Sequence, residues 1–511
     1  MVTFRTLLCP CPDFMNHIFR VLPATSPRRW VRRTARVLRM LRALGVLLVA
    51  APIMSACRRS PAGGAAATAS PAACLAPVLA PSSVSLASTS MTNPLVTFDT
   101  AWAIIARTHW DTTYNGVNWR ALRDTLRPRA AASKTTGELR VVLSDMVGRL
   151  RQSHFSIIPR EVSDVATGSS TSTGVDRSGT IGITLRYLDR MLAVTAVDPA
   201  GSAARAGVKA GWTLDGVEGC PVAPKLARIP TDIDPRRAAL LAYGIGAGAL
   251  AGAVGAPGQF TFRDGRNTIR ALSIVRAADR GTPAKFGNLP PFPAHLEFER
   301  VRRGRRTVGV IHFNIWMPVL AAQFDAAVDS LRDADAIVLD IRGNFGGVGG
   351  MSMGFAGHFL DSARAIGTMH QRGQGPMKFV ANPRRVDTRA QSVKPFAGPL
   401  ALVVDELSIS TTEIFAGGMQ AVGRARVFGS QTAGQALPSI PERLPNGDIL
   451  YHAIANFTSP TGKDIEGDGV KPDVVTPITR KALLEGKDPA LDAAVSWAAG
   501  AATRTANKVI P

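Results

Sequence analysis

With 511 residues, 46% of them hydrophobic, the chain is long enough for two or three domains and too apolar for a disordered protein. Its formal net charge of +22 would suit nucleic acid or an anionic membrane surface. No basic stripe with interleaved aromatic residues and no zinc-finger spacing of cysteines accompanies that charge, so we expect a solvated basic surface and no nucleic-acid partner.

The N-terminal segment predicts export. Arg42 precedes a short apolar run that ends at Ile53, which is too short to cross a membrane as a mature helix, and small residues then lead to Cys57. The small-small-cysteine ending resembles a bacterial lipoprotein cleavage box, with a plain signal peptide as the alternative. We therefore expect residues 1–57 to be a signal and lipoprotein segment, Cys57 to become the lipidated first residue after cleavage, and the protein to lie in a bacterial cell envelope on the periplasmic side.

Cysteines are few beyond that signal. If Cys57 is acylated, Cys74 and Cys220 are the one pair left, and they lie in a linker and in a later domain. We therefore expect no structural disulfide. No later hydrophobic run reaches about 18 residues, so the sequence predicts no transmembrane helix.

Two segments of contrasting composition follow the signal. Residues 58–92 consist largely of Ala, Pro, Ser and Gly and predict a flexible linker. Residues 93–165 place apolar side chains at a spacing near 3.6, most clearly between Leu139 and Leu150. This spacing predicts a small group of packed helices.

Strand patterns appear in residues 175–278. Residues 179–183 and 192–197 predict strands, and DPAGSAARAGVKAG at 198–211 reads as a turn, a short helix and a second turn. This arrangement resembles the centre of a PDZ domain, with a β-domain used only for packing as the alternative. The resemblance implies that a peptide C-terminus binds at backbone amides of Ile181, Gly182 and Ile183.

From residue 297 to about 500 the pattern alternates between strands and helices, with buried strands at 336–340 and 400–404, and this predicts an α/β domain. The first of these strands runs into LDIRGNFGG, which ends at Gly346 and Gly347. A glycine pair after a buried strand lets backbone amides face an anion. The patterns of phosphate-binding loops are missing here.

The second buried strand leads to SISTTEIFAGG, in which Ser410 stands at a strand-to-helix junction. There the helix N-terminus favours developing negative charge, so Ser410 is a candidate nucleophile. Ser410 and Glu413 also match a capping box, in which the serine only begins the helix. This segment alone leaves both interpretations open.

Together the two segments resemble the signatures of C-terminal processing and tricorn-core serine peptidases. The resemblance covers roughly residues 96–500 and implies an N-terminal helical region, a PDZ-like domain and a crotonase-like or ClpP-like α/β catalytic core. It also implies that Ser410 is the nucleophile. The oxyanion hole would then consist of backbone amides of Gly346 or Gly347 and of Thr411.

The resemblance to the processing peptidases implies a lysine as the general base, but this chain has Gln435 at the matching position. Glutamine cannot accept a proton from a hydroxyl at neutral pH. The tricorn-like branch implies another arrangement, in which His154 of RQSHF is the base and Glu466 orients it through Ser153. Lys463, close to Glu466 in the sequence, is a further candidate.

We therefore expect an exported serine endopeptidase that hydrolyses unfolded or exported proteins near accessible C-terminal tails, without a metal or another cofactor. One alternative is an inactive, lipid-anchored PDZ scaffold that binds protein C-termini, which the Gln435 substitution motivates. A second is a carrier of small apolar ligands. The sequence leaves the oligomeric state open.

Overall fold

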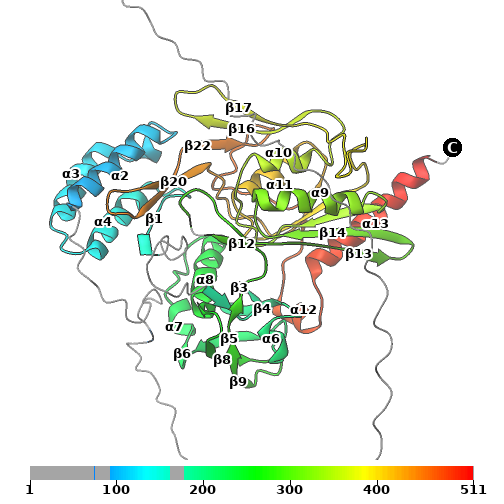
Figure 1. Ribbon diagram of the computed structural model, residues 1–511, viewed down its shortest axis with the longest axis horizontal. Helices are drawn as coiled ribbons and strands as arrows, with labels where there is room; N and C mark the ends of the chain where they lie inside the picture. The colour runs from blue at the N-terminus through cyan, green and yellow to red at the C-terminus, as the bar shows by residue number, and fades with distance from the viewer. Residues whose placement is uncertain (1–73, 75–92, 162–177, 290, 510–511) are drawn as a thin grey trace, which may run out of the picture. The chain divides into compact units, whose positions relative to one another are not determined.

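The computed structural model of the protein describes Cys74 and residues 93–161, 178–289 and 291–509 (Figure 1). The predicted signal with Cys57, and the predicted linker apart from Cys74, lie outside the described residues. Within them the chain combines helices with several sheets, so the expected α/β class is correct at this level. No helix in the described ranges is both long and apolar enough to cross a membrane.

Helices dominate residues 93–150, hereafter the helical region. Each of the three α-helices described here begins where an Asn or Thr side chain accepts a hydrogen bond from a first-turn amide, which satisfies a donor without a partner inside the helix. Phe98, Leu126 and Leu143 form their shared core, which Leu450 of a later strand completes. The elements are α2 (Pro94–Thr108), η1 (Tyr114–Gly116), α3 (Trp119–Ala131) and α4 (Thr136–Gly148).

Residues 178–278 form a small β-domain. Its main sheet is antiparallel with the order β3-β4-β5-β8-β9, and α8 packs against β3. Because β3 is an outer strand, one of its edges has no strand partner among the described residues. The elements are β2 (Ser178–Thr180), β3 (Ile183–Leu188), β4 (Met191–Val197), α6 (Ser202–Arg205), β5 (Thr213–Val217), β6 (Cys220–Pro221), α7 (Ala223–Leu226), α8 (Pro235–Leu250), β7 (Gly252–Ala253), β8 (Pro257–Arg263), β9 (Ile269–Val275) and β10 (Ala277–Ala278).

A six-stranded sheet forms the centre of the remaining chain. Its order is β13-β14-β15-β18-β19-β23, and neighbours from β14 onward are parallel. The central strands β15 and β18 are buried along their whole length, as parallel strands covered on both faces must be. Phe324, Phe355 and Phe415 pack in the core on one face, and α13 lies along the other face (Figure 1).

Three smaller sheets accompany this central sheet, with the orders β17-β16-β22, β1-β21-β20 and β11-β12. In the second, β1 (Ser156–Ile158) pairs with β21, so the chain just after the helical region is fixed to the core. The elements are β11 (Thr282–Ala284), β12 (Phe292–Ala294), β13 (Leu296–Arg303), β14 (Arg306–Phe313), η2 (Pro318–Leu320), α9 (Ala321–Ser330), β15 (Ala336–Asp340), α10 (Met351–Ala356), β16 (Arg364–Gln371), β17 (Met377–Ala381), β18 (Leu400–Val404), α11 (Thr411–Ala421), β19 (Arg426–Gly429), β20 (Ser439–Arg443), β21 (Ile449–Ala453), β22 (Ala455–Thr458), β23 (Val474–Val475), α12 (Arg480–Leu484) and α13 (Pro489–Val509).

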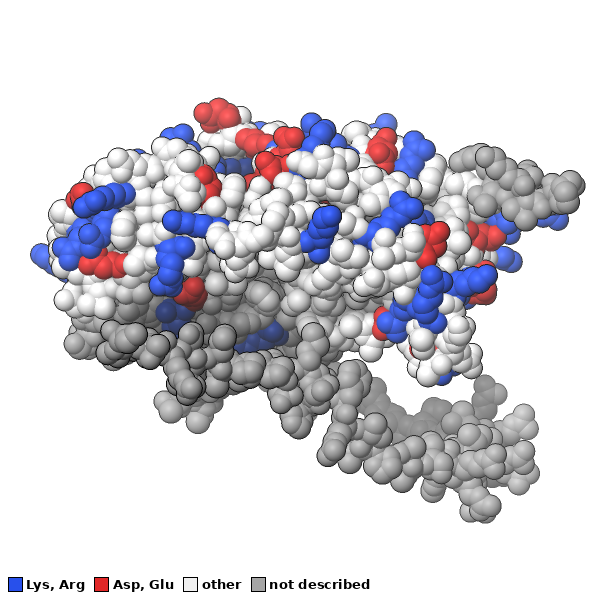
Figure 2. All heavy atoms as spheres, turned by 90° about the horizontal axis from the view of Figure 1, so that it is seen from above, with Lys and Arg blue, Asp and Glu red and all other residues white. Residues whose placement is uncertain are grey.

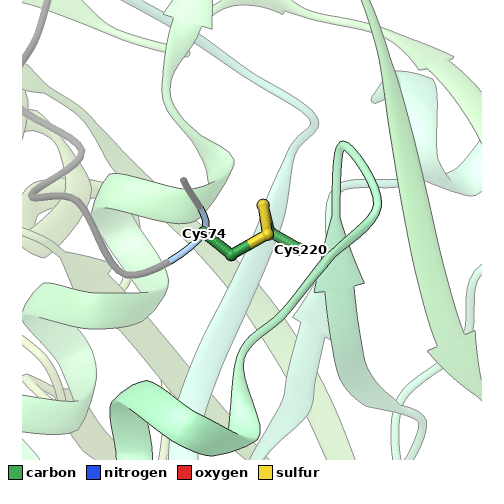
Figure 3. Close-up of a disulfide and its surroundings, with 2 residues drawn as sticks. All are labelled: Cys74 and Cys220. Carbon is green, nitrogen blue, oxygen red and sulfur yellow. A yellow bond between two sulfur atoms is a disulfide. The ribbon is translucent and has the colours of Figure 1, made fainter. Parts of the chain in front are cut away.

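A disulfide joins Cys74 to Cys220 of β6 (Figure 3), so the expectation of no structural disulfide was wrong. The two residues are separated by 146 positions in the sequence, yet their Cα atoms lie 5.1 Å apart. That distance is within the range a disulfide needs. Counting cysteines could not reveal it, because only the folded structure brings Cys74 next to Cys220.

Charged side chains are mixed on the face shown in Figure 2. Lys and Arg are scattered there among Asp, Glu and uncharged residues. Several arginines of the described chain are held in short ion pairs, such as Arg129 with Asp145 and Arg300 with Asp333. On this face the positive charge is therefore spread out rather than gathered into one patch.

Candidate active site

Ser410 lies in the turn between β18 and α11, immediately before the first residue of the helix. Its backbone has φ 59° and ψ −121°, a left-handed conformation that is rare for a residue with a side chain. The amide of Ser410 donates to the carbonyl of Gln435 at 2.8 Å and to Oε2 of Glu413 at 3.2 Å. These bonds hold the serine in a strained turn, where its hydroxyl stands beside the helix N-terminus.

Glu413 is fully buried and fixes the surroundings of Ser410. Its Oε1 accepts from the hydroxyl of Thr432 at 2.5 Å and from the amide of Gly434 at 2.7 Å, and its Oε2 accepts from the amide of Gln435 at 2.9 Å. Burial raises the pKa of Glu413 to about 7, against the lowering effect of these donors. The carboxyl group acts as a structural tie between Ser410 and residues 432–435.

The glycine turn lies directly against this serine. Gly346 has φ +88°, and a Cβ atom at this position would be 2.6 Å from Cβ of Ser410 and 3.0 Å from the amide nitrogen of Thr411. Only glycine can therefore occupy the position without displacing the serine. Oδ1 of Asn344 accepts from the amide of Gly346 at 3.0 Å and from the hydroxyl of Thr412 at 2.9 Å, which ties the turn to α11.

The amides around the turn differ in their availability. The Gly346 amide is occupied by Asn344, whereas the amides of Gly347 and Thr411 have no acceptor among the described residues. The hydroxyl of Thr411 donates to the carbonyl of Gly347 at 2.9 Å and so holds the two residues together. Of the two glycines suggested by the sequence, Gly347 is the one with a free donor.

His154 belongs to a chain of hydrogen bonds that ends at Glu466. The hydroxyl of Ser153 donates to Oε2 of Glu466 at 2.9 Å, and its Oγ lies 2.7 Å from Nδ1 of His154. Because the serine proton is given to the glutamate, Nδ1 must donate to Ser153. The lone pair of the imidazole is then on Nε2, which is the protonation state that a general base needs.

The environment keeps this histidine neutral. Burial lowers the pKa of His154 to about 4. Burial also raises the pKa of Glu466, although amides of Ser153 at 2.8 Å and Ala436 at 2.9 Å donate to its carboxylate and oppose the change. The ring of Tyr451 lies 5.7 Å from the ring of His154, centroid to centroid, and forms part of the apolar wall.

Two consecutive residues connect the serine to this chain of bonds. The carbonyl of Gln435 accepts from the amide of Ser410, and the amide of Ala436 donates to Glu466. Within the described residues no hydrogen bond joins His154 directly to Ser410. The structure thus brings Ser410 and Glu466 to the same short segment.

Two family models match the chain. The peptidase family S41 model matches residues 307–476, and the tricorn protease C1 domain model matches residues 92–148. Residues 307–476 are therefore a peptidase family S41 domain. This domain contains both the glycine turn and Ser410, while the tricorn C1 match covers the helical region that precedes His154.

Similar proteins carry names that agree with this family. Carboxyl-terminal-processing peptidase 2, chloroplastic, of Arabidopsis thaliana is 26% identical over 78% of this chain and 72% of its own length. The carboxyl-terminal-processing protease of Picosynechococcus is 23% identical over 74% of this chain and 82% of its own. The solved photosystem II D1 C-terminal processing protease is 20% identical with a TM-score of 0.51, covering 77% of this chain and 95% of its own, and shares its fold.

Gln435, which stands at the position of the expected lysine, and Lys463, the other candidate base, lie in different surroundings. Gln435 lies beside Ser410 through its backbone, and its side chain is half-buried. Lys463 is exposed in a turn closed by hydrogen bonds to Ser459, and no contact with Ser410 is found within the described residues. The geometry therefore gives no support to Lys463 as a base.

The predicted peptide-binding residues lie where the small β-domain begins its edge strand. The carbonyl of Ile181 accepts from the amide of Ala203 at 3.0 Å, and the carbonyl of Gly182 accepts from the amide of Asp198 at 2.9 Å. Ile183 begins β3 and pairs with Val197. These bonds shape the turn before β3 and leave the outer edge of that strand open.

Two arginines of the small β-domain contact the site, and sequence reasoning missed both. Arg186 of β3 donates to Asp405 at 2.7 Å, and the same carboxylate accepts from the Gly343 amide at 2.8 Å. Arg236 of α8 donates to the carbonyls of Thr432 at 3.1 Å and Gly467 at 3.0 Å. No local pattern marks these arginines, because their partners lie hundreds of residues away.

Proposed function

We propose that this protein is a serine peptidase of family S41, which hydrolyses peptide bonds with Ser410 as the nucleophile and His154 as the general base. The observation that supports the proposal best is the chain of hydrogen bonds from Glu466 through Ser153 to His154. It leaves Nε2 of the imidazole unprotonated and is fixed to the segment that also holds Ser410.

In the first step Nε2 of His154 removes the proton of the Ser410 hydroxyl while Oγ attacks the carbonyl carbon of the scissile bond. Negative charge develops on the carbonyl oxygen, and the free amides of Gly347 and Thr411 donate to it. The imidazolium formed at His154 is stabilised by Glu466 through the hydroxyl of Ser153. This stabilisation matters because the buried site otherwise disfavours a charged ring.

In the second step the Nε2 proton passes to the leaving amine, the C–N bond breaks and an acyl ester forms on Ser410. Water then attacks the ester carbonyl with His154 again as the base. The same amides receive the second oxyanion, and the carboxylic acid product leaves with Ser410 restored. Glu413 takes no part in proton transfer, since its oxygens are already bonded to the surrounding residues.

The substrate class follows from the small β-domain, which we interpret as PDZ-like. Its edge strand β3 could accept an extended peptide as an added strand, with the carboxylate at the turn of Ile181, Gly182 and Ile183. Arg186, on the same strand, contacts the residues around the glycine turn through Asp405. C-terminal tails of unfolded or exported proteins are therefore the substrates proposed here.

Export is proposed on two grounds. The sequence before Cys57 reads as a lipoprotein signal, and the disulfide between Cys74 and Cys220 requires an oxidising compartment such as the bacterial periplasm. Mass spectrometry of the protein isolated from membranes checks this directly. We expect a diacylglyceryl group on Cys57 and an intact disulfide, whereas an uncleaved N-terminus with free thiols would refute export.

Cleavage of an unfolded, C-terminally labelled protein tests the catalytic proposal. We expect Ser410→Ala and His154→Ala to lower kcat by about 10⁴–10⁶-fold, because each removes a member of a unit that acts together. Ser362→Ala, an exposed serine, is the matched control and should cut normally. Full activity of His154→Ala would reject this base, and a wild-type protein that binds tails without cutting them would reject the peptidase.

A further inference from the structure

His154 and Arg151, three positions before it, have unusual backbone conformations. Arg151 has φ +53° and His154 has φ +61°. Asp189, Arg190 and Glu218 also have positive φ, but they occupy tight hairpin turns, where this is ordinary. Arg151 follows the turn that ends α4, and His154 lies in no hairpin, so contacts from elsewhere must hold the segment 150–155, which we name the base loop.

A second strained loop supplies those contacts. Tyr114 and Asn115 have φ +51° and +54° and lie in residues 109–116, which we name the clasp. The Asn115 side-chain amide donates to the carbonyl of Leu150 at 2.9 Å. At the other end of the clasp, Nε2 of His109 donates to Oε1 of Gln152 at 3.0 Å.

The aromatic ring of Phe155 completes the attachment. It stacks on the ring of His109 with centroids 5.5 Å apart and an interplanar angle of 14°. The clasp therefore contacts the base loop at Leu150, Gln152 and Phe155. Ser153 and His154 have little freedom left to turn away from Glu466.

The clasp is itself rigid. The Asp111 carboxylate accepts from the amide and hydroxyl of Thr113 at 2.8 and 2.7 Å and from the amide of Asn115 at 2.7 Å. The Tyr114 ring stacks on Trp119 of α3, with centroids 5.6 Å apart. His109 is fully buried at the end of α2. The strain at Tyr114 and Asn115 is thus fixed by the helical region.

We propose that the clasp, through His109 and Asn115, is the element that positions the general base, so that the helical region is part of the catalytic unit. This inference rests on the proposed role of His154. The clasp residues are positioning residues that act through the base loop. Without them, Ser153 and His154 lose the geometry in which the serine hydroxyl bonds both the imidazole and Glu466.

Two substitutions in the full chain test the proposal without removing core volume. Asn115→Gly keeps the left-handed backbone free of strain and deletes only the side-chain donor. Gln152→Met keeps the length of the side chain and deletes the acceptor. Trp102→Phe is the control, because it removes a 2.9 Å hydrogen bond to Trp119 in the same helical region without touching the base loop.

We expect both test variants to lower kcat about 100-fold, the size of loss that a misplaced catalytic group produces, with KM nearly unchanged. The acid limb of their kcat/KM profile should move upward, since a looser base loop exposes His154 to water. Gln152→Glu, which retains the acceptor, should recover most of the activity. Trp102→Phe should keep the wild-type kcat and pH profile.

Hydrogen exchange of the amides from Arg151 to Phe155, followed by mass spectrometry, separates this inference from the proposed function. Faster exchange in Asn115→Gly and Gln152→Met, but not in Trp102→Phe, supports the clasp even if the wild-type protein cuts nothing. Wild-type exchange and wild-type kcat in both test variants would overturn it.

Discussion

The two sides of the candidate site are held by different kinds of constraint. On the serine side, formed by Gly346, Ser410 and Glu413, the backbone is crowded to the point where one added carbon would collide with Ser410. On the base side, formed by Ser153, His154 and Glu466, the order depends on hydrogen bonds between residues 313 positions apart. Steric crowding tolerates almost no change, whereas a chain of hydrogen bonds can fail by degrees.

Among the substitutions that compare the two sides without removing Ser410 or His154, Gly346→Ala should have the largest effect, because it changes the crowded side. The added Cβ would lie 2.6 Å from Cβ of Ser410, and the φ of +88° would be strained as well. We expect a loss of kcat of about 10³-fold, comparable to removal of an oxyanion donor, together with a lower Tm. Peptide cleavage and thermal unfolding measure the two effects.

Gly354→Ala is the control for that substitution. Gly354 lies in α10 with a negative φ, and no atom lies within 4 Å of the position that its Cβ would take. Activity should be normal and Tm equal or slightly higher. Normal cleavage by Gly346→Ala would show that the serine side is not defined by crowding.

Glu466→Gln tests the base side with little change of shape. The new amide can donate to Oγ of Ser153, and the serine proton would then turn toward Nδ1 of His154. Nε2 would carry the imidazole proton and could not act as a base. We expect kcat to fall about 100-fold with KM unchanged, less than for Gly346→Ala, because part of the population keeps the original direction of hydrogen bonds.

The neighbouring exposed residue Asp468 provides the control for charge alone. Asp468→Asn removes the same negative charge two residues away and should cleave normally. Equal losses in the two variants would mean that the base side depends on local charge and not on the bond to Ser153.

The same contrast explains what the sequence could predict. Ser410 and the glycine pair lie in short segments at the ends of two buried strands, and parallel strands bring such ends together, so local pattern could predict their proximity, whereas the role of Ser410 was implied by resemblance to a family. His154 and Glu466 could be linked only through resemblance to a family. The disulfide of Cys74 and the contacts of Arg186 and Arg236 were missed, since they depend on how separate parts of the chain pack.

The pH dependence of kcat/KM shows which side limits activity. The low pKa of His154, about 4, keeps the base neutral over the ordinary pH range. Activity should hold as pH falls from 8 to 5 and then decline as the imidazole becomes protonated. Burial also raises the pKa of Glu466, which is linked to His154 through Ser153. The acid limb therefore reports the ionisation of these two groups together.

Control of activity by the serine side would give a different limb. Burial raises the pKa of Glu413 to about 7, so kcat/KM would break near that pH if protonation of Glu413 disturbed the bonds that hold Ser410. A break of kcat/KM near pH 7 would therefore place the limiting group on the serine side and contradict the base-side assignment. Return of samples from each pH to pH 8 before assay separates reversible titration from unfolding.

Gln435→Lys should have the smallest effect and asks whether the serine side can provide its own base. The backbone of Gln435 is fixed beside Ser410 by bonds to Ser410 and Glu413, independently of the base side. In a His154→Ala background we expect a lysine at position 435 to raise kcat about tenfold above that of His154→Ala alone. Activity should rise toward alkaline pH as the amine loses its proton. His154→Ala combined with Gln435→Met is the control and should restore nothing.

Recovery of activity by the lysine would show that the two sides are separable and that this chain uses the distant base although a nearer position exists. Failure of the lysine, with the fold intact, would show that the side chain at 435 does not reach the hydroxyl, so that the base side is the only source of proton transfer to and from Ser410.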